Sequence, residues 1–438
     1  MRGVGHPVVL GLSGGGDSMA LLELAAGWAR ARGRRLLAVT IDHGLNPSSP
    51  HWGRICEQAC ASLDVGWIEA PWVGDKPSSG LTAAARMARH RLIAEAARKT
   101  GAKVILLAHT ADDIAESDWM SARGSSLGRL REWSPSPAWP EGRGLMLLRP
   151  LLSEGRGDLR SFLRRRGRDW IEDPANSDVR FARSRARLAI LPESEVGPAQ
   201  TGRISSAVES DAQVSDPARS LTPGASAAVP VPLPLGEGFE VERDVPAEVL
   251  AAVLLCAAGS STPPRNDHLA RLTGRLGSTG MFTATLAGAR IEASKDHVVI
   301  GREPGEFQRR PAADQRLAPG EPAVWDGRFE ITTSEPGWSV TAAAGRLSRL
   351  SDADRTIVGT VPVWARGGLP VLLRDGGAGP VLAWRQAGVL ALAPRRLALF
   401  PGTRSGETTQ EADLFRSIHG ETPPADLFSH NDHHRGLG

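Results

Sequence analysis

Near its start the chain carries a short polar loop, SGGGDS from Ser13 to Ser18, between an apolar run and a helical stretch. Its glycines let the backbone come close to an anion, and its serines can donate hydrogen bonds. A helix that begins there adds free N–H groups and the positive end of its dipole. The loop is therefore predicted to bind phosphate, with a cation such as Mg²⁺ between Asp17 and the phosphates.

Other glycine loops fit this stretch less well. A Walker loop needs a lysine after the glycines, and none follows. A dinucleotide fingerprint needs glycines at its first, third and sixth positions, which no frame from Gly11 or Gly14 supplies, although Asp42 lies at a suitable distance. The alternative is a glycine turn with a purely structural role, in which Asp17 or Ser18 caps a helix.

A second polar group follows an apolar run at 104–108 and enters a helix. Such a position lies at the carboxyl edge of a parallel sheet, where ligands bind. Thr110 to Asp113 also matches a capping box, which would account for one carboxylate of the group. The group consists of His109, Asp112, Asp113 and Glu116.

Arginines form two further patterns. Arg86, Arg89 and His90 are spaced i, i+3 and i+4, so they share one face of a predicted helix. Beside a nucleotide this face would neutralise phosphate charge; elsewhere it would be a solvated basic face. A dense basic stretch suits RNA phosphates, or else a solvated helix; it contains Arg156, Arg160, Arg164, Arg165, Arg166, Arg168, Arg180, Arg183, Arg185 and Arg187.

The elements that must position these groups alternate between strand and helix. This alternation predicts a doubly wound α/β domain with a parallel sheet. The expected strands are 8–12, 36–41, 65–69 and 104–108, and the expected helices are 18–31, 51–63 and 82–100, two of which stop before Gly33 and Gly101.

The length of 438 residues indicates more than one domain. Residues 1–192 are predicted to be the phosphate-binding domain with its arginine-rich end, and 193–245, rich in Pro, Ser, Ala and Gly, a linker or irregular insertion. Residues 246–310 are expected to form a small domain of helices (247–276) and strands (282–301). Residues 311–438 are expected to form a β-rich domain with a frayed tail from His430.

Composition limits the class of protein. Hydrophobic residues make up 41% and charged residues 23%, the balance of a soluble protein. No apolar run approaches the roughly 18 residues of a membrane span, and the start lacks an export signal, so a cytoplasmic protein without a membrane partner is expected. Cys56, Cys60 and Cys256 form no Cys-x-x-Cys pair. Cys56 and Cys60 share one face of a predicted helix and are predicted to be buried free thiols.

The ordered set of motifs resembles the PP-loop ATP pyrophosphatases, and among them the tRNA(Ile)-lysidine synthases. The resemblance covers about residues 6–192, and the C-terminal half is similar only in stretches such as WDGRF at 325–329. After the loop come IDHGL at 41–45, AARMAR at 84–89, AHTADD at 108–113, RPLL at 149–152, WIEDPANSD at 170–178, and then Arg183, Arg185 and Arg187.

This resemblance implies an enzyme that uses ATP and Mg²⁺ to ligate free L-lysine to C2 of the wobble cytidine of a tRNA(Ile) with anticodon CAU. Cytosine O2 attacks the α-phosphate and pyrophosphate leaves. The lysine amine then expels AMP, which leaves lysidine. Because the amine must lose a proton to attack, a carboxylate or histidine is needed nearby, and Asp113 and His109 are the candidates.

The resemblance also assigns roles residue by residue. The ATP site comprises Ser13, Gly14, Gly15, Gly16, Asp17, Ser18, Asp42 and His43, and Mg²⁺ is assigned to Asp17 and Asp113. Catalytic roles fall to Asp17, Arg86, His109 and Asp113, and contacts with lysine or tRNA to Asp112, Glu116, Arg183, Arg185 and Arg187. The sequence departs from the family pattern at four positions, His90 for tyrosine, Ala108 for glycine, Ile114 for glutamine and Ser117 for threonine.

Other functions remain as alternatives. A cytidine thiolase of the same superfamily would keep the loop, but one with an iron–sulfur cluster needs cysteine pairs that this chain lacks. An ammonia-using synthetase would carry a glutaminase-like domain before the loop. A catalytically impaired RNA-binding relative would explain Ile114 and Ala108. A homodimer is left open.

Overall fold

The computed structural model describes residues 5–123, 130–173, 182–190, 229–309, 314–377 and 379–400. Its N-terminal unit is built on a six-stranded sheet in the order β3-β2-β1-β4-β6-β5. Five strands are parallel, and β5 runs antiparallel to β6. The strands are β1 (Val8–Gly11), β2 (Leu36–Asp42), β3 (Gly66–Pro71), β4 (Val104–Leu106), β5 (Trp133–Pro135) and β6 (Met146–Leu148).

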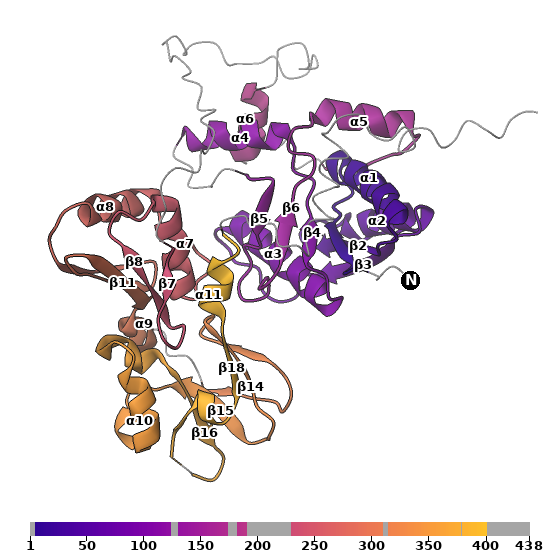
Figure 1. Cartoon of the computed structure of the whole chain (residues 1–438). Coiled ribbons are helices and arrows are strands. Elements are labelled where there is room, and N and C mark those ends of the chain that lie inside the picture. The colour runs from indigo at the N-terminus through magenta and orange to yellow at the C-terminus, as the bar shows by residue number, and fades with distance from the viewer. Residues whose placement is uncertain are drawn as a thin grey trace, which may run out of the picture.

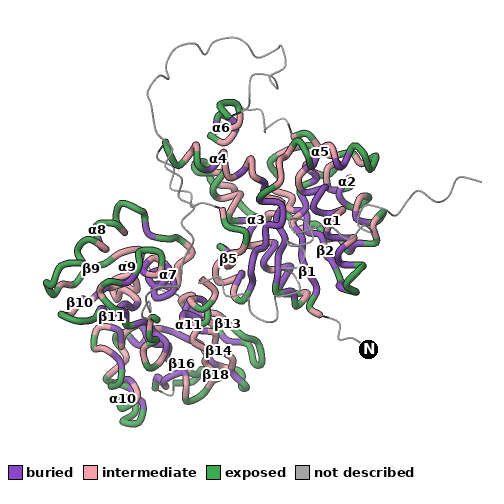
Figure 2. The backbone as a smooth tube through the Cα atoms, turned by 45° about the horizontal axis from the view of Figure 1, so that its top comes forward, coloured by how far each residue is buried: buried purple, intermediate pink, exposed green. Residues whose placement is uncertain are grey.

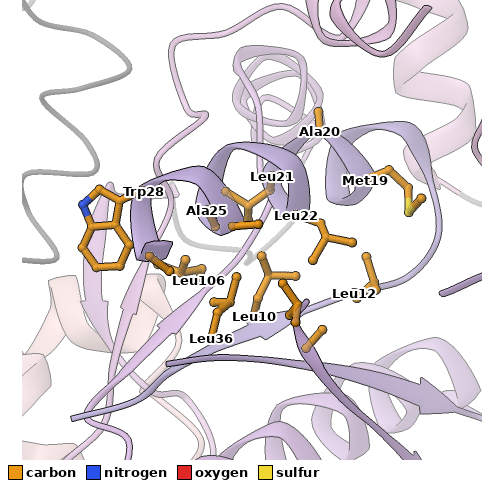
Figure 3. Packing of buried hydrophobic residues seen from close by; sticks show 14 of the residues in the cluster. Leu10, Leu12, Met19, Ala20, Leu21, Leu22, Ala25, Trp28, Leu36 and Leu106 are labelled. Carbon is orange, nitrogen blue, oxygen red and sulfur yellow. The ribbon is translucent and has the colours of Figure 1, made fainter. Parts of the chain in front are cut away.

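Helices cover both faces of this sheet because its strands are apolar on both sides (Figure 1). Val8 and Leu10 of β1 pack in one core with α1, as Figure 3 shows for Leu10, whereas Val9 packs in a second core with α3. The helices of this unit are α1 (Gly16–Arg32), α2 (Ser49–Ser62), α3 (Leu81–Lys99), α4 (Ala111–Ser121), α5 (Arg156–Arg165) and α6 (Ala182–Ile190).

The predicted doubly wound α/β domain is confirmed. Each strand and helix expected between residues 8 and 108 is present, with boundaries shifted by one or two residues. Gly33 and Gly101 follow α1 and α3 at φ 62° and 74°, a left-handed conformation that ends a helix at little cost only in glycine. Cys56 and Cys60 of α2 are buried, as predicted, and so is Cys256.

The C-terminal unit contains three smaller sheets, with strand orders β7-β8-β11-β10-β9, β12-β15-β16-β17 and β13-β14-β18. The strands are β7 (Val231–Pro232), β8 (Gly238–Glu242), β9 (Phe282–Leu286), β10 (Ala289–Ala293), β11 (His297–Arg302), β12 (Gln315–Arg316), β13 (Ala323–Trp325), β14 (Phe329–Thr332), β15 (Trp338–Ala342), β16 (Pro370–Arg374), β17 (Val381–Leu382) and β18 (Gly388–Ala391). The α-helices are α7 (Ala247–Ala257), α8 (Asn266–Leu276), α9 (Pro304–Arg309), α10 (Asp352–Gly359) and α11 (Leu392–Leu397), and the short 3-10 helices are η3 (Leu347–Arg349), η4 (Val363–Gly368) and η5 (Ala383–Arg385).

Two details of this unit differ from the sequence-based expectations. Within the range expected to be a linker, residues 238–242 form β8, which pairs with β11 along its whole length. The helical stretch expected at 247–276 is two helices, with Gly259 at φ 60° between them. Residues 193–228 of the expected linker and the tail from His430 lie outside the described residues.

Burial separates the interior of the protein from its polar surface. In Figure 2 the central strands of the parallel sheet are mostly buried, whereas the outer faces of the helices are exposed, as is much of the edge strand β3. None of the helices within the described ranges has both the length and the apolar character that a membrane span requires.

Candidate active site

The phosphate loop lies between the end of β1 and the start of α1, and its two serines hold it together. Ser18 Oγ lies 3.1 Å from Ser13 Oγ and accepts a hydrogen bond from the Ser13 backbone N–H at 3.2 Å. Ser18 Oγ also donates to the Gly15 carbonyl oxygen at 2.9 Å. The serines therefore fix the curvature of a loop whose remaining N–H groups can face an anion.

Gly14 needs to be glycine for two separate reasons. Its φ of 81° is left-handed, and a Cβ there would lie 2.3 Å from Cδ1 of Ile171. The Ile171 backbone N–H donates to the Gly14 carbonyl oxygen at 2.9 Å. Residues 170–171, which the sequence marks only as part of a family motif, thus support the back of the phosphate loop. The motif residues 174–178 lie outside the described ranges.

Asp17 points toward an arginine that begins α5. Its Oδ2 lies 3.2 Å from Nε of Arg156, while its Oδ1 is buried without a hydrogen-bond partner among the described residues. Burial raises the pKa of Asp17 above its usual value, and Arg156 acts in the opposite direction. A buried carboxylate oxygen with no partner is able to bind a cation beside the phosphates.

The carboxylates of α4 are held by different partners. Asp113 Oδ2 accepts a hydrogen bond from the Thr110 backbone N–H at 2.9 Å, as the capping-box pattern predicts. Its Oδ1 lies 3.0 Å from Nη2 of Arg183. Asp112 Oδ2 accepts from the Arg156 backbone N–H at 2.8 Å. The cap and an ion pair therefore coexist on Asp113.

Glu116 is the most deeply buried of these carboxylates, with 2% of its side chain exposed. Its Oε1 lies 3.2 Å from Nη1 of Arg156 and 2.9 Å from Nε of Arg187, and its Oε2 lies 2.9 Å from Nε of Arg183. Three guanidinium groups from two helices thus neutralise one carboxylate, which fixes α5 and α6 to α4.

His109 lies beside Arg149, the first residue of the RPLL motif. Its Nδ1 accepts a hydrogen bond from Nε of Arg149 at 3.2 Å. Burial first, and then the neighbouring arginines, hold the pKa of His109 well below its usual value. A neutral imidazole whose Nδ1 lone pair is engaged carries its proton on Nε2, so His109 is arranged to donate a hydrogen bond.

Arg86 and Arg89 of α3 lie near the same cluster. Burial lowers the pKa of Arg86, with Arg183 adding to the effect and Asp113 opposing it. Burial also lowers the pKa of Arg89 to about 10. Arg89 therefore remains charged at neutral pH, because pH 7 lies far below that value.

Asp42 and His43 lie at the end of β2, at the same carboxyl edge of the sheet. Asp42 Oδ1 accepts from the Gly44 backbone N–H at 2.8 Å, which shapes the turn. The His43 ring makes an edge-to-face contact with Trp72 at 6.0 Å between centroids. Nδ1 of His43 is buried without a hydrogen-bond partner in the described parts of the chain.

The fold therefore brings together most of the residues singled out from sequence. Asp17, Asp112, Asp113 and Glu116 are linked through Arg156, and Arg183 and Arg187 join from α6. Arg185 is exposed, as its position between two inward-facing arginines requires. Sequence reasoning missed the roles of Arg149 and Arg156 in this cluster. From the sequence, Arg156 was assigned only to the basic stretch. The local feature that could have indicated its role is its position at the start of a helix.

The residues fit a metal ion only in part. No group of three or more His, Cys, Asp or Glu residues within the described ranges could hold a metal ion. Mg²⁺, however, commonly uses one or two carboxylates together with substrate phosphates and water. The unpartnered Oδ1 of Asp17 beside the loop suits a cation that gains its other ligands from ATP.

The parallel sheet, the glycine loop after its first strand and the carboxylates gathered there define an ATP-binding domain of the PP-loop class. The family model described as PP-loop domain matches residues 4–194. Curated relatives named tRNA(Ile)-lysidine synthase extend the match to most of the chain.

The relative from Caulobacter vibrioides is 44% identical over 379 residues, which are 85% of this chain and 86% of that protein. The relative from Hyphomonas neptunium is 35% identical and covers 79% of this chain and 92% of its own length. The relative from Mesorhizobium japonicum is 35% identical and covers 80% of this chain and 78% of its own length. This chain belongs to the tRNA(Ile)-lysidine synthase family.

Proposed function

We propose that this protein is an ATP-dependent ligase that forms lysidine at the wobble cytidine of a tRNA(Ile) with anticodon CAU. The observation that carries the proposal is the match to the curated tRNA(Ile)-lysidine synthase of Caulobacter vibrioides, at 44% identity over 85% of the chain. The site agrees in its chemistry, because a phosphate loop lies next to a buried cluster of carboxylates and arginines. As a tRNA-modifying enzyme it would work in the cytoplasm.

In the first step the loop from Ser13 to Ser18 holds the pyrophosphate that leaves when cytosine O2 attacks the α-phosphate of ATP. Arg86 and Arg89 keep a positive field around the phosphates, which stabilises charge as it develops on the leaving group. Mg²⁺ held by Asp17, with Asp113 as a second carboxylate, would supply charge neutralisation to ATP.

In the second step the ε-amine of lysine attacks C2 and AMP leaves. Free lysine is cationic at neutral pH, so a carboxylate must attract it and accept a proton. We assign proton acceptance to Asp113 because the single Nδ1 lone pair of His109 is engaged with Arg149, whereas Oδ1 of Asp113 keeps a second lone pair beside its bond to Arg183. His109 can instead donate its Nε2 proton to a substrate oxygen.

The α6 arginines have two different environments. Arg183 and Arg187 face Glu116, so their proposed contribution is to order the site. Arg185 is exposed on the same helix and remains the proposed contact with tRNA phosphates. Glu116, proposed from sequence as a substrate contact, would reach lysine only if one of its three arginines moved. Light scattering tests the homodimer, which the sequence left open.

The experiment that tests the function mixes the protein with ATP, labelled lysine and a CAU-anticodon tRNA(Ile) transcript. We expect label on the RNA only when ATP is present, with AMP and pyrophosphate formed in equal amounts. A protein that retards the transcript on a gel but attaches no lysine would be an RNA-binding relative. Incorporation of sulfur from a sulfur donor, without lysine, would make it a thiolase.

A further inference from the structure

Arg156 is the residue at which the phosphate loop and the carboxylates of α4 meet. Its Nε lies 3.2 Å from Asp17, its Nη1 3.2 Å from Glu116 and its Nη2 3.8 Å from Asp113. Only 14% of the side chain is exposed. One guanidinium group thus bridges the ATP side of the site to the α4 side.

The position of Arg156 offsets an unfavourable charge within the phosphate loop. A carboxylate inside a phosphate-binding loop repels polyphosphate, and this loop lacks the lysine with which Walker loops counter such charge. A guanidinium group is not deprotonated in proteins, and Arg156 has Asp17, Glu116 and Asp113 as ion-pair partners. Arg156 is therefore a permanent cation placed next to Asp17.

The neighbours of Arg156 leave it able to change partners. Glu116 keeps Arg183 and Arg187, and Asp113 keeps Arg183, if Arg156 turns toward an incoming phosphate. Asp17 alone would lose its ion-pair partner, and a cation arriving with ATP could take that place. A guanidinium group carries five N–H donors in a fixed fork, which suits phosphate oxygens.

We propose that Arg156 is a phosphate-contacting residue, a built-in counter-cation that allows the loop to accept ATP beside Asp17 before any metal ion neutralises that carboxylate. The inference rests on the ATP binding of the proposed function but not on lysine transfer. It assigns to Arg156 a role in nucleotide affinity beyond the bracing of α5 against α4.

The test measures the Kd of a non-hydrolysable ATP analogue by calorimetry, without tRNA or lysine, once in EDTA and once in Mg²⁺. In Arg156→Met we expect metal-free affinity to fall about 10- to 100-fold, the loss expected for a charge-assisted hydrogen bond. Affinity in Mg²⁺ should fall several-fold less, because the metal can neutralise Asp17. The ratio of the Kd in EDTA to the Kd in Mg²⁺ should therefore rise.

The matched control is Arg290→Met, which removes another arginine paired to a glutamate, 2.6 Å from Glu292 in the C-terminal unit. It should leave both Kd values unchanged. An equal loss of affinity in both buffers, or none, in a folded Arg156→Met protein would show that Arg156 only braces the structure.

If Arg156→Met does not fold, Arg156→Lys provides the test, because lysine keeps the positive charge but has fewer N–H donors. A metal-free Kd at least threefold weaker than wild type, with a smaller change in Mg²⁺, supports the proposal. An unchanged metal-free Kd overturns it. Lysine transfer plays no part in this assay, so failure of the proposed function would remain a separate result.

Discussion

Trp139 donates its indole N–H to the carbonyl oxygen of Gly327 at 2.8 Å, across 188 residues of sequence. The contact joins the N-terminal unit to the turn between β13 and β14, and two further contacts surround it. The Arg396 guanidinium lies 4.0 Å from the centre of the Trp139 ring, and Arg143 Nε lies 2.7 Å from Glu330 Oε2. The C-terminal unit is therefore attached to the catalytic domain by specific side chains.

Trp139→Phe tests this attachment. The variant leaves the Gly327 carbonyl without its donor, so we expect a loss of about 1 to 3 kcal/mol in the coupling between the units. The KM for tRNA should rise while the KM for ATP stays constant, because only the large substrate can contact both units. Trp133→Phe is the control, since the Trp133 indole N–H has no hydrogen-bond partner in the described part of the chain. Equal changes in both variants would contradict the prediction.

Gly14→Ala should disable ATP binding. The new Cβ meets both a left-handed φ of 81° and the Ile171 side chain at 2.3 Å, so the loop must shift. Gly33→Ala is the matched control, because its φ is 62° and nothing lies within 4 Å of the added atom. Both proteins should lose about 1 kcal/mol or more from backbone strain, but only Gly14→Ala should weaken ATP affinity by tenfold or more. Calorimetric titration with an ATP analogue decides between the outcomes.

Glu116→Gln should destabilise the catalytic domain. Three arginines would lose a shared buried carboxylate, and breaking such a buried arrangement costs about 3 kcal/mol. Glu248→Gln breaks an exposed pair with Arg131 and should cost no more than about 1 kcal/mol. Thermal unfolding of both variants provides the comparison. A wild-type melting temperature for Glu116→Gln would show that the cluster contributes no net stability.

His90 should make stability depend on pH. Burial, and then the nearby charges of Arg89 and Arg86, lower its pKa from 6.5 to about 2. Below pH 6.5 the unfolded chain therefore binds a proton at His90 that the folded protein does not. The contribution of the neutral His90 to the free energy of unfolding is complete above pH 6.5 and is lost as pH falls. Between pH 7.5 and 5.5 wild type should lose about 1 kcal/mol more than His90→Phe. Urea unfolding at both pH values measures the difference, and parallel curves would refute the prediction.

Asp17→Asn keeps the shape of the side chain but removes its charge. We expect tRNA-dependent pyrophosphate release to fall at least about 100-fold, since a cation next to the phosphates would lose its carboxylate ligand. Asp64→Asn, in an exposed turn after α2, should retain full release. Undiminished release by Asp17→Asn would remove Asp17 from the mechanism.

Much of the fold was predictable because its signals are local. The glycine loop between a strand and a helix, the glycines that end α1 and α3, and the Thr110 to Asp113 capping box each depend on a few neighbouring residues. The strand at 238–242, within the expected linker, has no such local signal. Gly238–Glu242 becomes a strand because β11 offers it a partner, and sequence spacing carries no information about such long-range pairing.

The sequence alone determined the order of the motifs, and with it the class of chemistry, since residue type decides which groups can bind phosphate or accept a proton. Only the tertiary structure decided which charges meet. Arg156 and Asp17 are 139 residues apart, and Arg187 and Glu116 are 71 apart. Ion pairs depend on distance in space, which the packing of α5 and α6 against α1 and α4 sets.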